Sequence, residues 1–465
     1  MALAAHKQGN HKQHTHIIMS TKSGWTTLRQ APVASSRTDD IWFFDKNNGW
    51  LCNSSGYIAR TRDGGQYWDQ MHFVPPGGPN FPYLRSMSWS DRQNGYVGMV
   101  TGISANTPDA EKPAELLAAE LNAIPYSDYL LVQTRDGGET WNWVPLPPGS
   151  PPGICGIHAV PNSGVAYGSG TNDPGLKPPA VVKTVDYGAN WEVIPMDEHA
   201  DNLIDIFFFD ENHGFVVGGK NSDSCPTSDP AYPFPRLSRY VQLRPVVLET
   251  TDGGKTWVNR TQNLLDDDSL KPPQRPACGE WGWKIQFLPD KKHGFVSLEN
   301  FRGAAILKTT DGGQTWERKH VAADQGPDTK PINNDLEGIG FLTAKKGWVG
   351  GWGNNFNGFM NSYTEDGGET WVRQDYNPTN PPAGDPRYRI NRYRFVDNVG
   401  YCSGQLIYKL KHGKAFGGKT TFGTSKKKEA FAADQTTFGK STVTSKPDRA
   451  DPAHGGQAGE GGAGK

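Results

Sequence analysis

The 465-residue sequence lacks three features that would mark particular protein classes. No run of about 18 apolar residues exists, so we expect no membrane-spanning helix. The formal net charge is -1, which provides no general attraction to nucleic acid, so a charged partner would have to meet a local patch. The first 20 residues are polar and contain several histidines, without the apolar stretch of a secretory signal, which predicts a cytoplasmic protein.

Cysteine is also scarce: five residues are widely spaced, at Cys52, Cys155, Cys225, Cys278 and Cys402. An odd number at these spacings forms neither a disulfide framework nor a CxxC metal site, and we expect no bound metal and no cofactor. Cys225 and Cys278 lie in proline-rich loops and could pair in an oxidising compartment. The missing signal favours free thiols in a reducing cytoplasm.

What the sequence does contain is repetition. An eight-residue phrase with an aspartate, glycines and a tryptophan occurs six times, as TRDGGQYW (61–68), TRDGGETW (134–141), TVDYGANW (184–191), TTDGGKTW (250–257), TTDGGQTW (309–316) and TEDGGETW (364–371). The copies are separated by roughly 50 to 70 residues, a spacing typical of propeller repeats. We call each phrase a box.

A second phrase occurs seven times, as in IWFFDKNNGWLC (41–52) and IFFFDENHGFVVG (206–218). It combines an alternating apolar strand, a polar turn ending in glycine and a second apolar strand. A third strand precedes each box, and the tryptophan of the box begins a fourth. Four strands form one propeller blade, so the chain is predicted to be all-β.

The seventh unit, residues 393–414, stops after its third strand. The segment KSGWTTLR (22–29) has the tryptophan-led pattern of a fourth strand. We therefore predict a seven-bladed β-propeller over residues 23–413, in which the N-terminal strand completes the last blade and leaves no open edge.

Several segments depart from the repeat. Insertions are expected at residues 102–128, 220–243 and 261–281, and loops of this length are usually functional or disordered. Residues 1–22 are predicted to be a disordered N-terminal segment. Residues 414–465 have little to bury and are predicted to be a disordered, low-complexity tail.

The box aspartates are predicted to be structural. Glycine permits backbone angles that other residues avoid, and aspartate and threonine side chains bind turn backbone groups. The tryptophan pins the turn to the sheet. The aspartates would lie on separate blades and could not converge on one substrate, which argues against catalysis by Asp63, Asp136, Asp186, Asp252, Asp311 and Asp366.

The box pattern resembles the Asp-box, or BNR repeat, and together with the preceding phrase it is most similar to the photosystem II stability/assembly factor family. The resemblance covers about residues 23–413, without the insertions, and is carried by residues that build blades. It implies a non-enzymatic scaffold that presents a protein-binding face on a rigid propeller. Sialidases and xyloglucanases share the box, so a carbohydrate-binding propeller or a glycoside hydrolase is the alternative.

The densest charge cluster is PRYRINRYRF (386–395), at the start of the seventh unit. The resemblance implies that a basic patch binds the protein partner, which assigns that role to Arg387, Arg389, Arg392 and Arg394. Arginine presents a planar fork suited to carboxylates and carbonyls. The alternative is that these arginines pair with acidic loops, such as the one containing Asp266, Asp267 and Asp268.

Trp281, Trp283 and Trp352 could form an aromatic platform for a sugar or a peptide. The alternative is that they pack between blades. A glycosidase would need two carboxylates about 5 to 10 Å apart. Asp40, Asp91 and Glu337 are candidates, but their spacing does not distinguish them from other carboxylates.

Overall fold

The computed structural model describes residues 24–32, 37–73, 82–101, 130–170, 178–227, 240–267, 269–270, 274–300, 304–322, 334–352, 362–373, 390–397 and 399–411. The segments 1–22, 102–128 and 414–465 that the sequence set apart lie outside these residues. The described residues are almost entirely β-structure, with one short helix, α3 (Gln262–Asp266), in the 261–281 insertion. No helix among them is long and apolar enough to cross a membrane.

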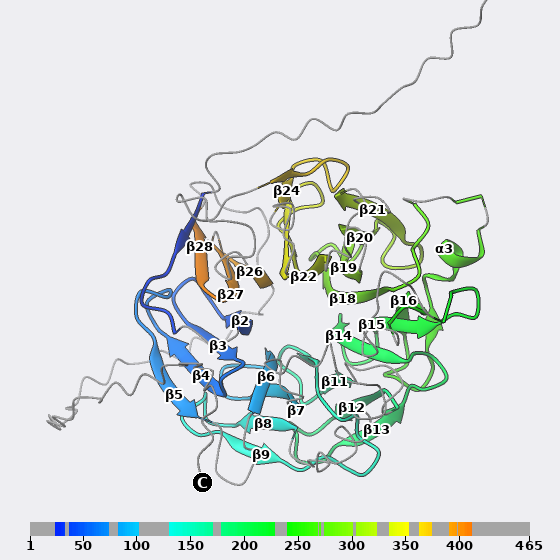
Figure 1. Cartoon of the computed structure of the whole chain (residues 1–465). Coiled ribbons are helices and arrows are strands. Elements are labelled where there is room, and N and C mark those ends of the chain that lie inside the picture. Colours follow the sequence, from blue (N-terminus) through cyan, green and yellow to red (C-terminus); the bar gives the residue numbers. More distant parts are fainter. Residues whose placement is uncertain are drawn as a thin grey trace, which may run out of the picture. The chain divides into compact units, whose positions relative to one another are not determined.

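The strands form antiparallel four-stranded blades around a common centre (Figure 1). Blade one contains β2 (Thr38–Phe43), β3 (Gly49–Asn53), β4 (Tyr57–Thr61) and β5 (Asp69–Phe73). Blade two contains β6 (Pro82–Trp89), β7 (Gly95–Thr101), β8 (Leu131–Thr134) and β9 (Asn142–Val144). Blade three contains β10 (Gly156–Ala159), β11 (Ala166–Gly170), β12 (Ala180–Thr184) and β13 (Glu192–Pro195).

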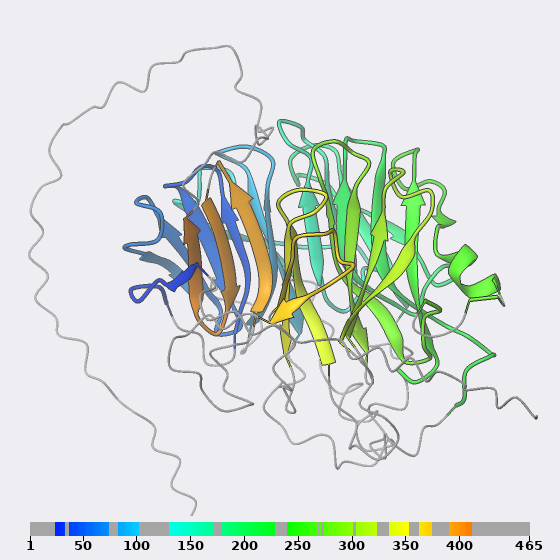
Figure 2. The same cartoon turned by 90° about the horizontal axis from the view of Figure 1, so that it is seen from above.

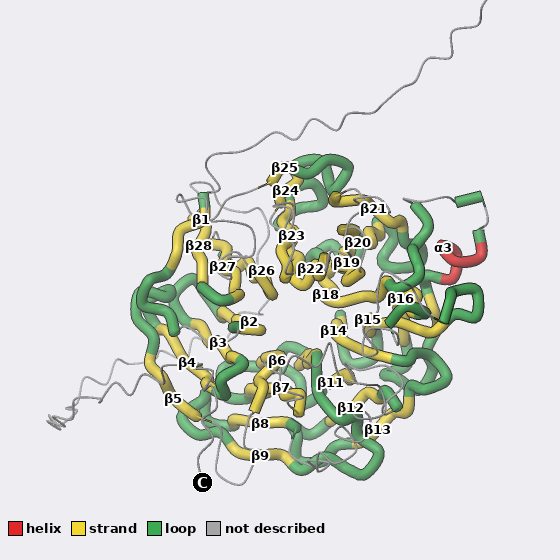
Figure 3. The backbone as a smooth tube through the Cα atoms, viewed as in Figure 1, coloured by secondary structure: helices red, strands yellow, loops and turns green. Residues whose placement is uncertain are grey.

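The remaining blades repeat this order from the centre outwards (Figure 3). Blade four contains β14 (Asn202–Phe208), β15 (Gly214–Asn221), β16 (Leu243–Thr250) and β17 (Val258–Asn259). Blade five contains β18 (Glu280–Phe287), β19 (Gly294–Asn300), β20 (Ala304–Thr309) and β21 (Glu317–Ala322). Blade six contains β22 (Asn334–Phe341), β23 (Gly347–Trp352), β24 (Ser362–Thr364) and β25 (Val372–Arg373), and blade seven contains β26 (Ile390–Val396), β27 (Val399–Gly404), β28 (Ile407–Lys411) and β1 (Trp25–Thr27).

The ring closes as the sequence predicted. The N-terminal strand β1 pairs with β28, with Trp25 opposite Leu410 and Thr27 opposite Tyr408. Trp25 is buried and packs edge-on against Trp348 of blade six, at 5.9 Å between ring centroids. The seven-bladed propeller with four-stranded blades is therefore confirmed, and Figure 2 shows the blades from a second direction.

Aromatic side chains hold neighbouring blades together. An aromatic residue near the start of the second strand of one blade stacks on the aromatic residue that ends the first strand of the next blade. Tyr167 stacks on Phe208 at 3.6 Å between ring centroids, and Phe295 stacks on Phe341 at 3.5 Å. The glycine before the leading aromatic is needed because a Cβ at Gly214 would lie 2.4 Å from the Phe208 ring. The second repeated phrase thus encodes the packing between blades.

The boxes share a core of local hydrogen bonds around the aspartate. In the box at 309–316, Asp311 accepts hydrogen bonds from the Thr309 hydroxyl (2.7 Å) and from the backbone N–H and hydroxyl of Thr315 (3.0 and 2.6 Å). Gly313 adopts φ +93°, and the Trp316 indole donates to its carbonyl at 3.1 Å. The bond from the seventh residue's backbone N–H recurs at the other box aspartates, Asp63, Asp136, Asp186, Asp252 and Asp366.

The boxes also contact the preceding blade, which the sequence did not indicate. Lys308 in β20 of blade five donates to the carbonyl of Gly367, in the box of blade six, at 2.9 Å. Lys183 and Gly253 make the equivalent bond between blades three and four at 3.0 Å. A box therefore joins the third strand to the fourth and also fastens its blade to the previous one.

Candidate functional site: charged residues inside the ring

Charged side chains gather on the innermost strands, at the centre of the ring. Asp40 in β2, Asp205 in β14, Lys284 in β18 and Arg392 in β26 are all buried. Each follows a register irregularity in the pairing of its strand with the next. A bulge changes the direction of the side chains beside it. The irregularities therefore interrupt the regular alternation of these strands and turn the four charged side chains toward the ring interior.

Arg392 joins three blades. Its guanidinium donates to both carboxylate oxygens of Asp40 in blade one (3.1 and 3.3 Å) and to both of Asp205 in blade four (3.0 and 3.3 Å). Asp40 also accepts the backbone N–H of Met87 in blade two, and Asp205 accepts that of Ile285 in blade five, at 3.0 and 3.1 Å. The charges are paired and hydrogen-bonded, as burial requires, and they link five of the seven blades.

A second buried network lies beside this one. Arg37, just before β2, donates to Glu337 at 2.6 Å and lies 3.2 Å from Asp39. Arg85 of β6 donates to Asp39 at 2.6 Å, and the Asn391 side chain of β26 reaches the same oxygen at 3.3 Å. These contacts connect blades one, two, six and seven.

The surroundings of each group set the direction of its pKa shift. Burial alone would raise the pKa of Asp205, but Arg392 and Lys284 hold it below its ordinary value. Burial raises the pKa of Asp39 despite Arg37 and Arg85. Burial, together with repulsion from Arg392, lowers the pKa of Lys284 to about 8. The ring interior is thus a poorly solvated site in which charges depend on one another.

A cavity of about 330 Å³ opens at the hairpin ends of the innermost strands. Residues of all seven blades contribute to its walls, among them Trp42, His158, Phe207, Phe209, Phe287 and Arg394. The position of this cavity, at the end of the channel of a rigid ring, suits the binding of a ligand that reaches several blades at once.

Arg394 is a partly exposed cation in the wall of this cavity. It donates to the Ile41 carbonyl (3.2 Å) and to Asp40 (3.4 Å), and its guanidinium lies 5.2 Å from the Trp42 ring centroid. Its side chain is 31% exposed, and no described residue accepts a hydrogen bond from its Nη1. Arg394 is therefore held in place and still able to bind a carboxylate or carbonyl group.

His158 adds a polar atom to the same wall. Its ring lies 5.0 Å from that of Phe207, and its Nε2 is buried without a hydrogen-bond partner in the described part of the chain. Burial and the nearby arginines lower the pKa of His158 to about 4, so the ring is neutral at pH 7. The cavity thus combines aromatic walls with two accessible cations, Arg394 and the exposed Lys291, and one neutral imidazole.

The structure separates the four arginines that the sequence grouped. Arg387 and Arg389 lie outside the described residues. Arg392 is buried and pairs with Asp40 and Asp205 rather than facing a partner. Of the two arginines that the structure describes, Arg394 is the one with an accessible side chain, and the binding role expected of the cluster stays a prediction.

The proposed aromatic platform is not exposed in this structure. Trp281 and Trp283 are 3% and 4% exposed. Trp281 packs against Tyr240, at 4.8 Å between ring centroids, and Arg85 lies over the Trp283 ring at 4.9 Å from its centroid. The side chain of Trp352 lies outside the described residues. The geometry of the first two matches the alternative of packing between blades.

The three carboxylates considered for hydrolysis are engaged in other contacts. Asp40 pairs with Arg392, and Glu337 pairs with Arg37. Asp91 accepts the backbone N–H groups of the turn that follows it. The described residues contain no group of three or more His, Cys, Asp or Glu side chains placed to hold a metal ion.

Sequence reasoning did not predict the ion pairs inside the ring, although it named Asp40, Glu337, Arg392 and Arg394 for other roles. One signal was available: a charged residue directly precedes an isoleucine in three inner strands, in the pairs Asp40–Ile41, Asp205–Ile206 and Lys284–Ile285. A charge at that position in a buried strand indicates a partner elsewhere in the ring. The contacts themselves join residues up to 354 positions apart. These residues meet because the ring closes, so the local sequence does not show which of them are partners.

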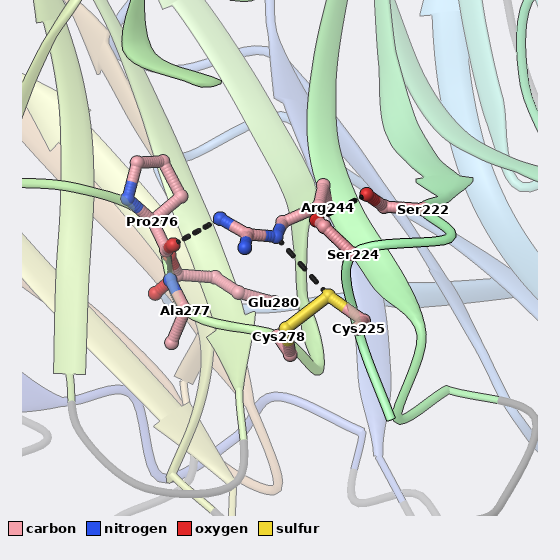
Figure 4. Close-up of a disulfide and its surroundings, with 8 residues drawn as sticks. All are labelled: Ser222, Ser224, Cys225, Arg244, Pro276, Ala277, Cys278 and Glu280. Atoms are coloured by element: carbon pink, nitrogen blue, oxygen red, sulfur yellow. Dashed lines mark hydrogen bonds between the residues drawn. A yellow bond between two sulfur atoms is a disulfide. The ribbon is translucent and has the colours of Figure 1, made fainter. Parts of the chain in front are cut away.

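A disulfide joins Cys225 to Cys278, which connects the segment after β15 to the segment before β18 (Figure 4). Arg244 lies beside it and donates to the Cys225 sulfur (3.2 Å) and to the Pro276 carbonyl (2.6 Å). The expectation of five free thiols is wrong for this pair. Cys52, Cys155 and Cys402 are buried and lie outside this disulfide.

Known proteins provide an independent comparison. No protein-family model matches the chain. Curated relatives include the photosystem II assembly lipoproteins Ycf48 of Prochlorococcus marinus strain SARG, 24% identical over 170 residues, and of Synechococcus sp. strain CC9902, 26% identical over 128 residues. The resemblance to photosystem II assembly factors is confirmed. The matches cover 30% and 28% of this chain and only 43% and 26% of the two Ycf48 proteins.

Solved structures share the fold at lower identity. A structure of Ycf48 bound to a D1 peptide has a TM-score of 0.51 at 17% identity and covers 85% of this chain and 99% of its own. Ycf48 from Cyanidioschyzon merolae has a TM-score of 0.50 at 16% identity and covers 83% of this chain and 98% of its own. An ancestral GH74 enzyme also reaches 0.50, at 12% identity, and covers 84% of this chain and 46% of its own. These three show the propeller fold.

Proposed function

We propose that this chain is a non-enzymatic propeller that binds a segment of a protein partner, in the manner suggested by its similarity to Ycf48 assembly factors. The observation that carries the proposal is the cavity at the end of the channel, where Arg394 stands exposed among aromatic walls. An extended chain can place a carboxylate or carbonyl oxygen on the guanidinium and apolar side chains against the rings.

Two further observations support a protein ligand. The sequence relatives are named photosystem II assembly proteins, and one structure with the same fold holds a D1 peptide. A D1 peptide is therefore the first probe to use. Because the site is built on inner strands that the ion pairs of Arg392 hold together, it is preorganised for binding.

The test measures binding of a fluorescently labelled D1 peptide to the full-length protein. Arg394→Ala should weaken binding by about tenfold or more, which corresponds to roughly 1.4 kcal/mol, since the exposed donor is lost. Arg394→Lys should retain part of the affinity because the charge remains without the fork. Arg92→Ala is the matched control, since Arg92 also lies over an aromatic ring, that of Phe44, but is exposed on the surface.

Equal binding by wild type, Arg394→Ala and Arg92→Ala would show that the peptide does not bind in the cavity. Absence of binding by the wild-type protein would contradict the proposed similarity in function to assembly factors.

A carbohydrate-binding or hydrolytic propeller is the second candidate, and the fold shared with a GH74 enzyme is what supports it. Its predicted platform has two buried tryptophans, Trp281 and Trp283. A glycan array and a panel of chromogenic glycosides test it, and a reproducible hit that Arg394→Ala leaves unchanged would favour it over peptide binding.

The disulfide supports a proposal about the compartment. Disulfides persist in oxidising compartments and are rare in the cytoplasm, so Cys225–Cys278 favours the former over the cytoplasmic location expected from the N-terminal residues. Protein isolated from its native cells and alkylated after unfolding should gain three labels without reductant and five with it. Five labels without reductant would favour the cytoplasm.

A further inference from the structure

Arg85 presents an unpaired edge of its guanidinium inside the ring. Its Nη1 donates to Asp39 at 2.6 Å, whereas its Nε and Nη2 are buried and have no hydrogen-bond partner among the described residues. These two nitrogens share one edge of the planar group, the edge that binds two oxygens of a single anion. Arg85 is 2% exposed, so bulk solvent does not provide the missing acceptors.

Other donors nearby are also unpartnered. Lys284 Nζ, Trp283 Nε1 and Ser86 Oγ are buried and make no hydrogen bond within the described part of the chain. Trp283 lies under the Arg85 guanidinium at 4.9 Å from the ring centroid, Lys284 follows it in β18, and Ser86 follows Arg85 in β6. The carboxylate oxygen paired with Lys284 Nζ, from Asp205, is 3.9 Å away. The charge of Arg85 also acts on Lys284, so these two cations lie near each other. Buried donors left unsatisfied indicate a missing acceptor.

The carboxylates of the two networks are already engaged. Asp39, Asp40, Asp205 and Glu337 each bind an arginine. His158 contributes no charge at pH 7, since burial lowers its pKa to about 4. The acceptor that the open donors of Arg85 and Lys284 need is therefore not one of these side chains.

We propose that the ring interior binds a small oxyanion, a phosphate or carboxylate group, between the Nε/Nη2 edge of Arg85 and the ammonium group of Lys284. The anion accepts the hydrogen bonds that Arg85 and Lys284 leave open. This site does not depend on the proposed peptide cavity, whose walls do not include Arg85 or Lys284.

The experiment is thermal unfolding of the full-length protein in sodium phosphate, sodium acetate or sodium chloride at equal ionic strength. A ligand that binds only the folded state raises the melting temperature by mass action. Wild type should show a saturable rise in phosphate, acetate or both, beyond that in chloride. A rise in phosphate alone identifies a phosphate group, and a rise in acetate alone or in both identifies a carboxylate-sized site.

Lys284→Met should abolish the anion-specific rise. This variant is suitable because it removes a buried cation of lowered pKa and leaves the ion pairs of Arg392 in place, so folding should persist. Lys346→Met is the matched control: Lys346 pairs with Glu365 on the surface at 3.1 Å, and its loss should leave the rise intact. No rise beyond chloride in wild type, or a rise that Lys284→Met retains, overturns the proposal and leaves ordered water as the partner of these donors.

Discussion

The boxes and the inner strands both rely on aspartate, but they use it differently. A box aspartate binds groups within four residues, and the same bonds recur six times around the ring. Asp39, Asp40 and Asp205 bind arginines of other blades, with Arg85 46 residues from Asp39 and Arg392 352 and 187 residues from Asp40 and Asp205. Repetition of the boxes indicates a structural role, because their aspartates lie in the turns between the third and fourth strands of separate blades and do not meet in one site. The unrepeated residues are therefore the ones that can confer a specific function.

The box aspartates and the interior aspartates also differ in how their surroundings change their pKa. Hydrogen bonds from the Thr256 side chain and backbone N–H lower the pKa of the exposed Asp252 to about 2. Burial raises the pKa of Asp39 in the ring interior. Box aspartates are thus stabilised as anions by local groups, whereas interior charges depend on partners in other blades.

The largest expected effect follows from breaking the interior network at Arg392. Arg392→Met leaves Asp40 and Asp205 buried without their main counter-charge, and such a loss costs about 3–5 kcal/mol of unfolding free energy. Urea unfolding followed by tryptophan fluorescence measures the change.

Arg62→Met is the control, because Arg62 is 54% exposed and pairs with Asp69 at the surface. An exposed pair contributes about 0–1 kcal/mol. Similar losses in the two variants would show that the interior ion pairs do not hold the ring together.

A smaller effect is expected at single boxes. Asp366→Ala removes the bonds to Thr364 and Thr370 and should cost about 0.5–2 kcal/mol, as the loss of a side-chain cap does. Asp136→Ala should cost a similar amount because its box makes the same bonds.

The boxes of Asp136 and Asp366 lie on blades two and six, so their losses should add to within about 0.5 kcal/mol in the double variant. Urea unfolding of the two single variants and the double variant tests this. A much larger loss in the double variant would mean that the boxes act together and not locally.

The smallest effect is the response to acid. The folded pKa of Asp186 and of Asp252 is about 2, below the ordinary value of 3.8, so the unfolded chain binds protons first. The boxes therefore contribute stability above about pH 4 that is lost as pH falls towards 2. Asp252→Asn should show a shallower decline in melting temperature over this range than wild type. An identical or steeper decline would contradict the assignment.

Much of the fold could be predicted because it is repeated. Trp25 stood out as a missing fourth strand once the other units were aligned, and its pairing with Leu410 follows from closing the ring. The interior could not be predicted in the same way. The bulge that directs Asp40 inward leaves no mark in the local pattern, and Arg392 looked like part of an exposed cluster because its partners are distant in sequence. The disulfide was foreseen as one of two options, and the choice between them rested on the N-terminus and not on the geometry of the loops.

The most direct test of the account is photo-crosslinking of a bound D1 peptide to the full-length protein, with the attached residues found by mass spectrometry. The account predicts attachment to the cavity walls around Arg394 and Phe207 on the innermost strands, and loss of that attachment in Arg394→Ala. Attachment to the box turns, unaffected by Arg394→Ala, would contradict it.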